Sequence, residues 1–187
     1  MVSMAHKEVD HKDHKDHKDC YEKDFKHCQC KCKIKCRPKC ETGLEKYEKT
    51  HFAEAMVLTC IDYRFIDTVI FYLEQNPTLS QKYDLTTLAG ASLGFNQDQF
   101  ECWRNTFIEL TELAIQLHHI KQLIVFDHMD CGAYQLLYPD LKLNTEEERQ
   151  LHIKNIRLFV KKVKKIFPKL IYSGYLAHDN GHIEKIV

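Results

Sequence analysis

The sequence lacks an excess of charge of either sign, and it lacks long apolar runs. Its 187 residues carry 27 basic and 27 acidic side chains, so no net field steers the chain toward nucleic acid or an anionic membrane. No run of about 18 uncharged apolar residues occurs, and a transmembrane segment is therefore not expected. The N-terminus has no apolar stretch of about 7–15 residues, which argues against a secretory signal. These absences predict a cytoplasmic protein that does not bind nucleic acid.

Large apolar side chains are scarce in the first 50 residues. Between positions 5 and 50 the only such residues are Val9, Tyr21, Phe25, Ile34, Leu44 and Tyr47. A segment of this kind buries too little apolar surface to offset the entropy that it would lose on folding. We therefore predict a disordered tail at residues 1–50 and one folded domain at residues 51–187, which is long enough for a single core.

The tail contains two motifs of biased composition. Residues 11–19 repeat His-Lys-Asp three times, as is typical of low-complexity sequence. Six of the nine cysteines also lie in the tail, at positions 20, 28, 30, 32, 36 and 40. Thiols among lysines suit a soft cation, because the lysines lower the thiol pKa. Three hypotheses stay open: a spacer with incidental metal affinity, a site for extra metal ions, and a segment that is S-acylated at a membrane.

From about residue 54 onward, strand patterns and helix patterns alternate. Apolar runs predict strands at 55–59, 84–89, 122–126 and 170–176. Apolar residues at helical spacing predict helices over 65–75, from about 100 to 117, and ahead of Pro168. The last helix is basic on its outer side, which we interpret as a solvated face because no aromatic residues accompany the charges. The second helix has the clearest apolar stripe, formed by Phe100, Trp103, Phe107, Leu110, Ala114 and Leu117.

This alternation predicts an α/β fold with three layers, α/β/α, around a mostly parallel four-stranded sheet. Right-handed crossovers between successive strands produce such a sheet and put helices on its faces. We predict the strand order 2-1-3-4, in which the first and third strands are neighbours. Open α/β sheets bind ligands at this switch point, outside the carboxyl ends of the strands.

Two short motifs follow these neighbouring strands. Residues 60–64 read Cys-Ile-Asp-Tyr-Arg, and residues 128–132 read His-Met-Asp-Cys-Gly. We expect the side chains of Cys60, His128 and Cys131 to converge at the sheet edge. Two thiolates and one imidazole suit tetrahedral Zn²⁺ and leave one coordination position open, as in catalytic zinc sites. A cysteine or histidine taken singly is more typical of packing, but this set at adjoining strand ends favours a functional site.

The two motifs resemble those of the β-class carbonic anhydrases, and the resemblance runs from about residue 57 to the last strand. It implies that Cys60, His128 and Cys131 bind Zn²⁺ and that Arg64 holds Asp62 away from the metal. The implied reaction is the reversible hydration of CO₂ to bicarbonate by a zinc-bound hydroxide that donates a hydrogen bond to Asp62.

The resemblance also implies a substrate site and an assembly. Gly90, Ala91 and Gly132 are expected to line the substrate site. A homodimer is expected to form through a sheet edge or a helix layer. The sequence departs from the family at Tyr63, where Ser is usual, and at Asp127, where Gly usually precedes the histidine. After the second strand, Leu-Ala-Gly-Ala-Ser at 88–92 stands where the family carries Asn-Ala-Gly-Asn.

Two other functions stay open. The fold and the ligand set also resemble those of carbonyl sulfide and carbon disulfide hydrolases, which use the same attack on another linear molecule. The second alternative is a non-catalytic zinc-binding protein with a degenerate enzyme domain. Asp62 and Arg64 discriminate against that alternative, because a purely structural zinc site needs neither of them.

Overall fold

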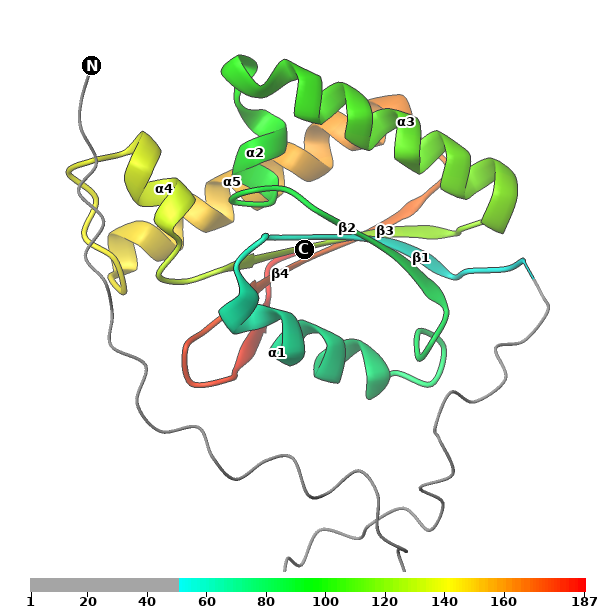
Figure 1. Ribbon diagram of the computed structural model, residues 1–187, viewed down its shortest axis with the longest axis horizontal. Helices are drawn as coiled ribbons and strands as arrows, with labels where there is room; N and C mark the ends of the chain where they lie inside the picture. The colour runs from blue at the N-terminus through cyan, green and yellow to red at the C-terminus, as the bar shows by residue number, and fades with distance from the viewer. Residues whose placement is uncertain (1–50) are drawn as a thin grey trace, which may run out of the picture. The chain divides into compact units, whose positions relative to one another are not determined.

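The structure, a computed structural model, describes residues 51–187 and contains a five-stranded sheet of order β2-β1-β3-β4-β5 (Figure 1). The strands are β1 (Ala55–Thr59), β2 (Tyr83–Thr87), β3 (Gln122–His128), β4 (Ile171–Ala177) and β5 (Ile183–Lys185). The helices are α1 (Tyr63–Glu74), α2 (Ser92–Asn96), α3 (Glu101–His118), α4 (Gly132–Leu137) and α5 (Glu146–Ile166). A 3₁₀ turn, η1 (Asp98–Phe100), leads into α3.

The predicted fold class and strand order are confirmed, with one strand added. β1 pairs in parallel with both β2 and β3, and β3 pairs in parallel with β4. β5, which was not predicted, lies antiparallel to β4 at the edge of the sheet. It has only three residues, and a strand this short has too few side chains to show an alternating pattern in the sequence.

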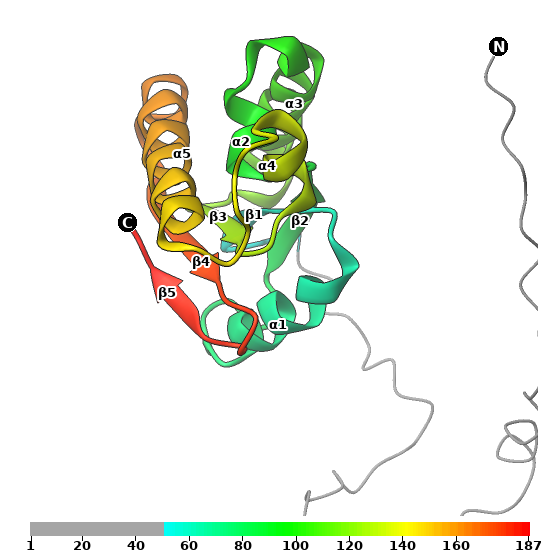
Figure 2. The same ribbon diagram turned by 90° about the vertical axis from the view of Figure 1, so that its left-hand side faces the viewer.

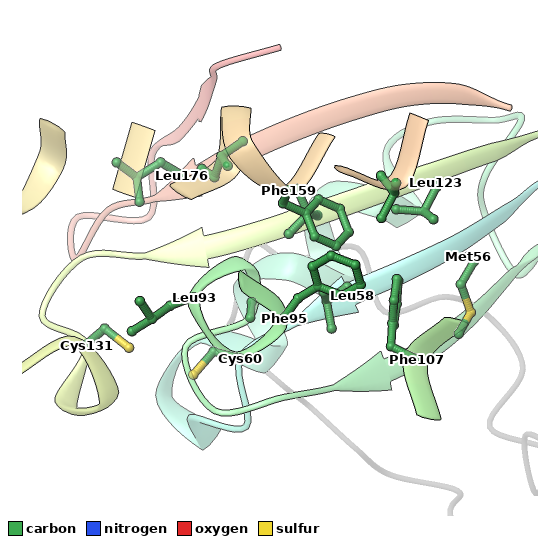
Figure 3. Packing of buried hydrophobic residues seen from close by; sticks show 14 of the residues in the cluster. Met56, Leu58, Cys60, Leu93, Phe95, Phe107, Leu123, Cys131, Phe159 and Leu176 are labelled. Atoms are coloured by element: carbon green, nitrogen blue, oxygen red, sulfur yellow. The ribbon is translucent and has the colours of Figure 1, made fainter. Parts of the chain in front are cut away.

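Helices lie on both faces of the sheet, so the predicted layers are present (Figure 2). On one face, Val69 and Leu73 of α1 pack against Val57 of β1 and Phe126 of β3. On the other face, α2, α3 and α5 contribute Phe95, Phe107 and Phe159 to a larger core, which Figure 3 shows from close by. Since β1 is covered on both faces, its side chains are all buried, as its continuous apolar sequence indicates.

One face of α3 was predicted incorrectly. Phe107 and Ala114 of the predicted stripe are buried, and Thr111 is buried with them. However, Leu110 and Leu117 of the same stripe are exposed to 39% and 58%. The stripe is wider than the surface that α5 and the sheet offer, so its outer leucines point away from the core of this chain.

The remaining expectations concern the N-terminal tail and membrane-spanning helices. The predictions of a disordered tail, a domain boundary near residue 50 and extra metal sites in the tail lie outside the described residues. Among residues 51–187, no helix combines the length and the apolar character of a membrane span.

The tightest backbone approach in the sheet leads to a stability prediction. A Cβ atom added to Gly174 of β4 would overlap with Cγ2 of Ile156 on α5. We expect Gly174→Ala to lower the free energy of unfolding by about 1–3 kcal/mol, as overpacking of a core does. Urea unfolding measures the loss, and Gly132→Ala is the control, because its added methyl group meets no atom within 4 Å.

A second substitution tests the cause. In Gly174→Ala/Ile156→Ala the overlapping methyl group is gone, so the double variant should lose less stability than the sum of the two single losses. Additive losses would contradict the steric explanation.

Candidate metal centre

The ends of β1 and β3 bring the three predicted ligands together. Cys60 follows the last residue of β1, His128 is the last residue of β3, and Cys131 is the N-cap residue of α4. One sulfur or nitrogen atom from each of them lies within 4.8 Å of the other two, and all three residues are buried. Cys60 and Cys131 lie at one end of the larger core (Figure 3). The predicted convergence is therefore present.

The imidazole of His128 is oriented so that one nitrogen remains available. Its Nδ1 lies 2.7 Å from the carbonyl oxygen of Met129, to which it must donate, because a carbonyl only accepts. The ring of Phe65 stacks on it with the ring centroids 4.2 Å apart. Nε2 is buried and has no hydrogen-bond partner. A metal ligand of this kind has its second nitrogen hydrogen-bonded and its first free to coordinate.

The two thiols interact with each other and with the backbone. The hydrogen bond with Cys131 lowers the pKa of the Cys60 thiol to about 4, against the effect of burial. The backbone N–H of Gly90, 3.3 Å from the Cys60 sulfur, acts in the same direction. The same thiol–thiol contact raises the pKa of Cys131. The Cys60–Cys131 pair therefore loses one proton readily. A cation that displaces the second proton would be bound by two thiolates.

These observations test whether the residues suit a metal ion. The donor set consists of two sulfur atoms and one unpartnered imidazole nitrogen, all buried and close together. Thiolate and imidazole ligands suit Zn²⁺ better than they suit Mg²⁺ or Ca²⁺, which prefer oxygen. The three residues therefore fit a zinc ion and leave its fourth position for a small molecule.

Asp62 and Arg64 form a bidentate pair beside this cluster. Arg64 donates from Nε to Oδ1 at 3.0 Å and from Nη2 to Oδ2 at 2.7 Å of Asp62. These hydrogen bonds lower the pKa of Asp62 to about 2, so the carboxylate is ionised at neutral pH. Its Oδ2 atom lies 3.9 Å from Nε2 of His128. A carboxylate oxygen is therefore next to the place where the donor atoms converge.

Arg64 is itself held by a residue that was not predicted. Its Nη1 donates to the carboxylate of Asp130 at 2.7 Å, and its Nη2 donates to the Asp130 carbonyl at 2.9 Å. Asp130 adopts a left-handed backbone conformation with φ of 57°, which Asp tolerates better than most residues. The pair of Asp62 and Arg64 is thereby attached to the loop that carries Cys131.

The residues predicted to bind substrate lie around the same cluster. Gly90, at φ of +71°, turns its N–H toward Cys60, and a Cβ atom added to it would lie 3.2 Å from the Cβ of Ala133. Ala91 is buried at φ of 41°, a conformation that is strained for a residue with a Cβ atom. Gly132 has open space on the side where a Cβ would stand. Their role in binding a substrate stays a prediction.

Further polar residues lie behind the cluster; in the sequence Asp127 was noted only as a departure from the family, and Glu148 and His152 were not singled out. Asp127, Glu148 and His152 are buried and joined by hydrogen bonds. One sequence signal was available: Thr145 and Glu148 form the Thr-x-x-Glu pattern of a helix start, and Thr145 accepts from the Glu148 N–H at 3.3 Å. That pattern locates the start of α5 and gives no reason to expect Glu148 in the interior.

Comparison with known proteins adds the family and the fold. Residues 49–187 match the model of a family described as "Putative carbonic anhydrase". Uncharacterized proteins of Rickettsia bellii and Rickettsia conorii are each 32% identical over 149 residues, covering 79% of this chain and 90% and 80% of their own lengths. The crystal structure of β-carbonic anhydrase isoform I from Trichomonas vaginalis matches with a TM-score of 0.51 and 17% identity, covering 78% of this chain and 88% of that one. At that identity the likeness shows a shared fold.

Proposed function

This chain belongs to that carbonic anhydrase family, and we propose that it is an enzyme that catalyses the reversible hydration of CO₂ to bicarbonate at a zinc ion. Cys60, His128 and Cys131 would hold the ion. The observation that carries the proposal is the Asp62 carboxylate, which Arg64 holds bidentately while its Oδ2 lies 3.9 Å from Nε2 of His128. A site that only stabilised the fold would have no use for a clamped carboxylate at its open side.

Each residue beside the donors has a distinct part in this proposal. When bound, Zn²⁺ acts as a Lewis acid that makes water nucleophilic near neutral pH. Asp62 is ionised and only accepts hydrogen bonds, so it would orient the attacking water by accepting a hydrogen bond from it. Arg64 donates hydrogen bonds to both carboxylate oxygens of Asp62 and to the carbonyl of Asp130. These contacts would hold the Asp62 carboxylate away from the coordination position that the water needs. Gly90, Ala91 and Gly132 would leave room for a small linear substrate.

We also propose a cytoplasmic location, because a zinc site with two thiolate ligands needs a reducing compartment. Within residues 51–187, Cys60, Cys102 and Cys131 are all free thiols. Reducing compartments keep thiols in this form, and a zinc site of two thiolates requires it.

Zinc content tests the ligand assignment. We expect Cys131→Ser to lose one zinc equivalent per chain, because serine is a poor ligand for this ion in place of a thiolate. Cys102→Ser is the matched control, since Cys102 is exposed on α3, away from the cluster. Elemental analysis of the full-length proteins measures both. Full zinc content in Cys131→Ser would remove Cys131 from the site.

Substitution of Arg64 tests whether it keeps Asp62 off the metal. Arg64→Ala should keep its zinc but lose CO₂ hydration by about 100-fold or more, because the released Asp62 carboxylate can take the open coordination position and no longer orients the water. Arg64→Lys should recover little, because an ammonium group cannot form the planar bidentate pair. Stopped-flow CO₂ hydration measures the rates, and Arg104→Ala, which breaks a surface pair with Asp98, is the control. Equal activity in Arg64→Ala and the parent would refute the clamp.

The same assay separates the proposal from its alternatives. Carbonyl sulfide is tested in parallel on the zinc-loaded parent. Hydrolysis of carbonyl sulfide without CO₂ hydration would assign the site to that hydrolase activity. A zinc-loaded parent that turns over neither substrate would indicate a zinc-binding protein without this catalysis.

We also propose that the chain forms a homodimer through β2 and α3. β2 is an edge strand within the described sheet, and edge strands need cover against uncontrolled pairing. Leu85 of β2 and Leu110, Leu113 and Leu117 of α3 are exposed to between 39% and 58%. Together with Met56 they line a groove of about 240 Å³. A second copy would cover these leucines and the strand edge at once.

Light scattering tests the dimer. Leu113→Glu should give a monomer mass where the parent gives a dimer, because the interface would bury an unpaired carboxylate. Leu158→Glu is the control, since Leu158 is 37% exposed but lies on α5. A parent that is monomeric at micromolar concentrations would rule the dimer out, and a dimeric Leu113→Glu would place its interface elsewhere.

A further inference from the structure

Two buried carboxylates with a histidine between them lie behind the metal-centre loop, residues 128–131. Asp127 precedes His128 on β3, while Glu148 and His152 lie one turn apart on α5. Their side chains have no exposed surface. We call these three residues the buried triad. Burying charged groups is costly unless they are paired and hydrogen-bonded, so their contacts should account for their presence.

The carboxylate of Asp127 accepts four hydrogen bonds. Its Oδ1 accepts from the backbone N–H of Ser92 at 3.0 Å, and its Oδ2 accepts from the Ser92 hydroxyl at 2.6 Å. Oδ2 also accepts from the hydroxyl of Tyr134 at 2.7 Å and from Nδ1 of His152 at 3.0 Å. A carboxylate with this many donors ties the end of β3 to α2, α4 and α5.

His152 links the two carboxylates. Its Nδ1 faces Asp127, and its Nε2 lies 3.5 Å from Oε1 of Glu148. Although burial opposes it, these two contacts raise the pKa of His152. The ring of Tyr134 packs on the imidazole, with the centroids 3.8 Å apart. The histidine is therefore fixed at both nitrogens and on its face.

Glu148 uses its oxygens on the backbone of the loop. Oε1 accepts from the N–H of Cys131 at 3.0 Å, and Oε2 accepts from the N–H of Asp130 at 3.2 Å. Oε2 also accepts from the N–H of Asn144 at 2.7 Å. Two consecutive amides of the loop are thus directed at one carboxylate, and one of them belongs to Asp130, the residue in the left-handed conformation. Without this acceptor, those amides would lose their partner.

The contacts continue to the pair of Asp62 and Arg64. Asp130, whose N–H binds Glu148, accepts two hydrogen bonds from Arg64 through its carboxylate and its carbonyl. Arg64 in turn holds Asp62. An unbroken hydrogen-bonded chain therefore runs from Asp127 through His152, Glu148, Asp130 and Arg64 to Asp62.

We propose that Asp127, His152 and Glu148 are positioning residues, which hold the backbone of the metal-centre loop so that Cys131 and the Asp62–Arg64 pair keep their places. The proposal rests on the proposed metal site. Stability alone does not explain the triad, because apolar residues of similar volume often stabilise a core as well or better than buried ions do. Its contacts with Cys131 and Asp130 do explain it.

Substitution of Glu148 is the direct test, with Glu147 as the matched control on the same turn. Glu148→Gln replaces one acceptor oxygen by an amide nitrogen that cannot accept from a backbone N–H. Glu148→Asp keeps the charge beside His152 but shortens the reach toward the loop. Glu147→Gln changes an exposed residue and should behave as the parent does.

Cadmium binding to the full-length proteins provides a readout that does not depend on catalysis. ¹¹³Cd NMR assigns the signal of the metal centre as the one that Cys131→Ser removes, which separates it from metal bound by the tail cysteines. We expect both Glu148 variants to bind Cd²⁺ about 10–100-fold more weakly at this site in competition with a chelator, as loss of a residue supporting a metal ligand does. Their signal should also shift relative to the parent. Folded Glu148 variants with the affinity and signal of Glu147→Gln would overturn the proposal.

Two further measurements keep the test decisive. If the variants do not fold, amide hydrogen exchange in the parent decides: the N–H groups of Cys131 and Asp130 should exchange far more slowly than those of the exposed loop at Asp179 and Asn180. Equal rates would overturn the positioning role. Failure of the parent to hydrate CO₂ would count against the proposed function only, whereas parent-like cadmium binding in the Glu148 variants of an active protein would count against the triad only.

Discussion

The register between β1 and β3 is the constraint on which the candidate metal centre depends. Thr59, the last residue of β1, pairs with Phe126, while β3 continues for two more residues paired only with β4. The end of β1 therefore stops short of the end of β3, and Cys60 arrives beside His128 instead of passing it. A shift by one residue would turn His128 to the other face of the sheet.

Charged residues lie in two groups around the end of β3. Arg64 binds the carboxylates of Asp62 and Asp130 at the open side, and the buried triad places a histidine between two carboxylates behind the loop. The two groups meet at Asp130. Its carboxylate and carbonyl accept hydrogen bonds from Arg64, and its N–H donates to Glu148. Hydrogen bonds to fixed charges are stronger than those between neutral groups. These hydrogen bonds explain how a loop with a left-handed residue holds Cys131, a candidate metal ligand, in place.

Some elements could be predicted from the sequence because their signal is local. β1 appears at 55–59 as predicted, since its first four residues are apolar and consecutive. The start of α5 has a capping threonine, and Pro168 follows its end. The outward side of α3 could not be predicted, because its leucines look like any core stripe until the width of the covering layer is known. β5 is likewise defined by its partner β4 and by nothing in its own three residues.

The sequence by itself determined the class of the fold and the chemistry of the candidate site. Cysteine, histidine, aspartate and arginine stand directly after predicted strands, and parallel strands end at one edge of the sheet. Only the tertiary structure decided how these residues are held. Glu148 and His152 lie on a helix that begins 15 residues after Cys131, and a polar residue on a helix gives no sign of facing inward. Long-range contacts of this kind depend on how α5 crosses the sheet, which no local pattern encodes.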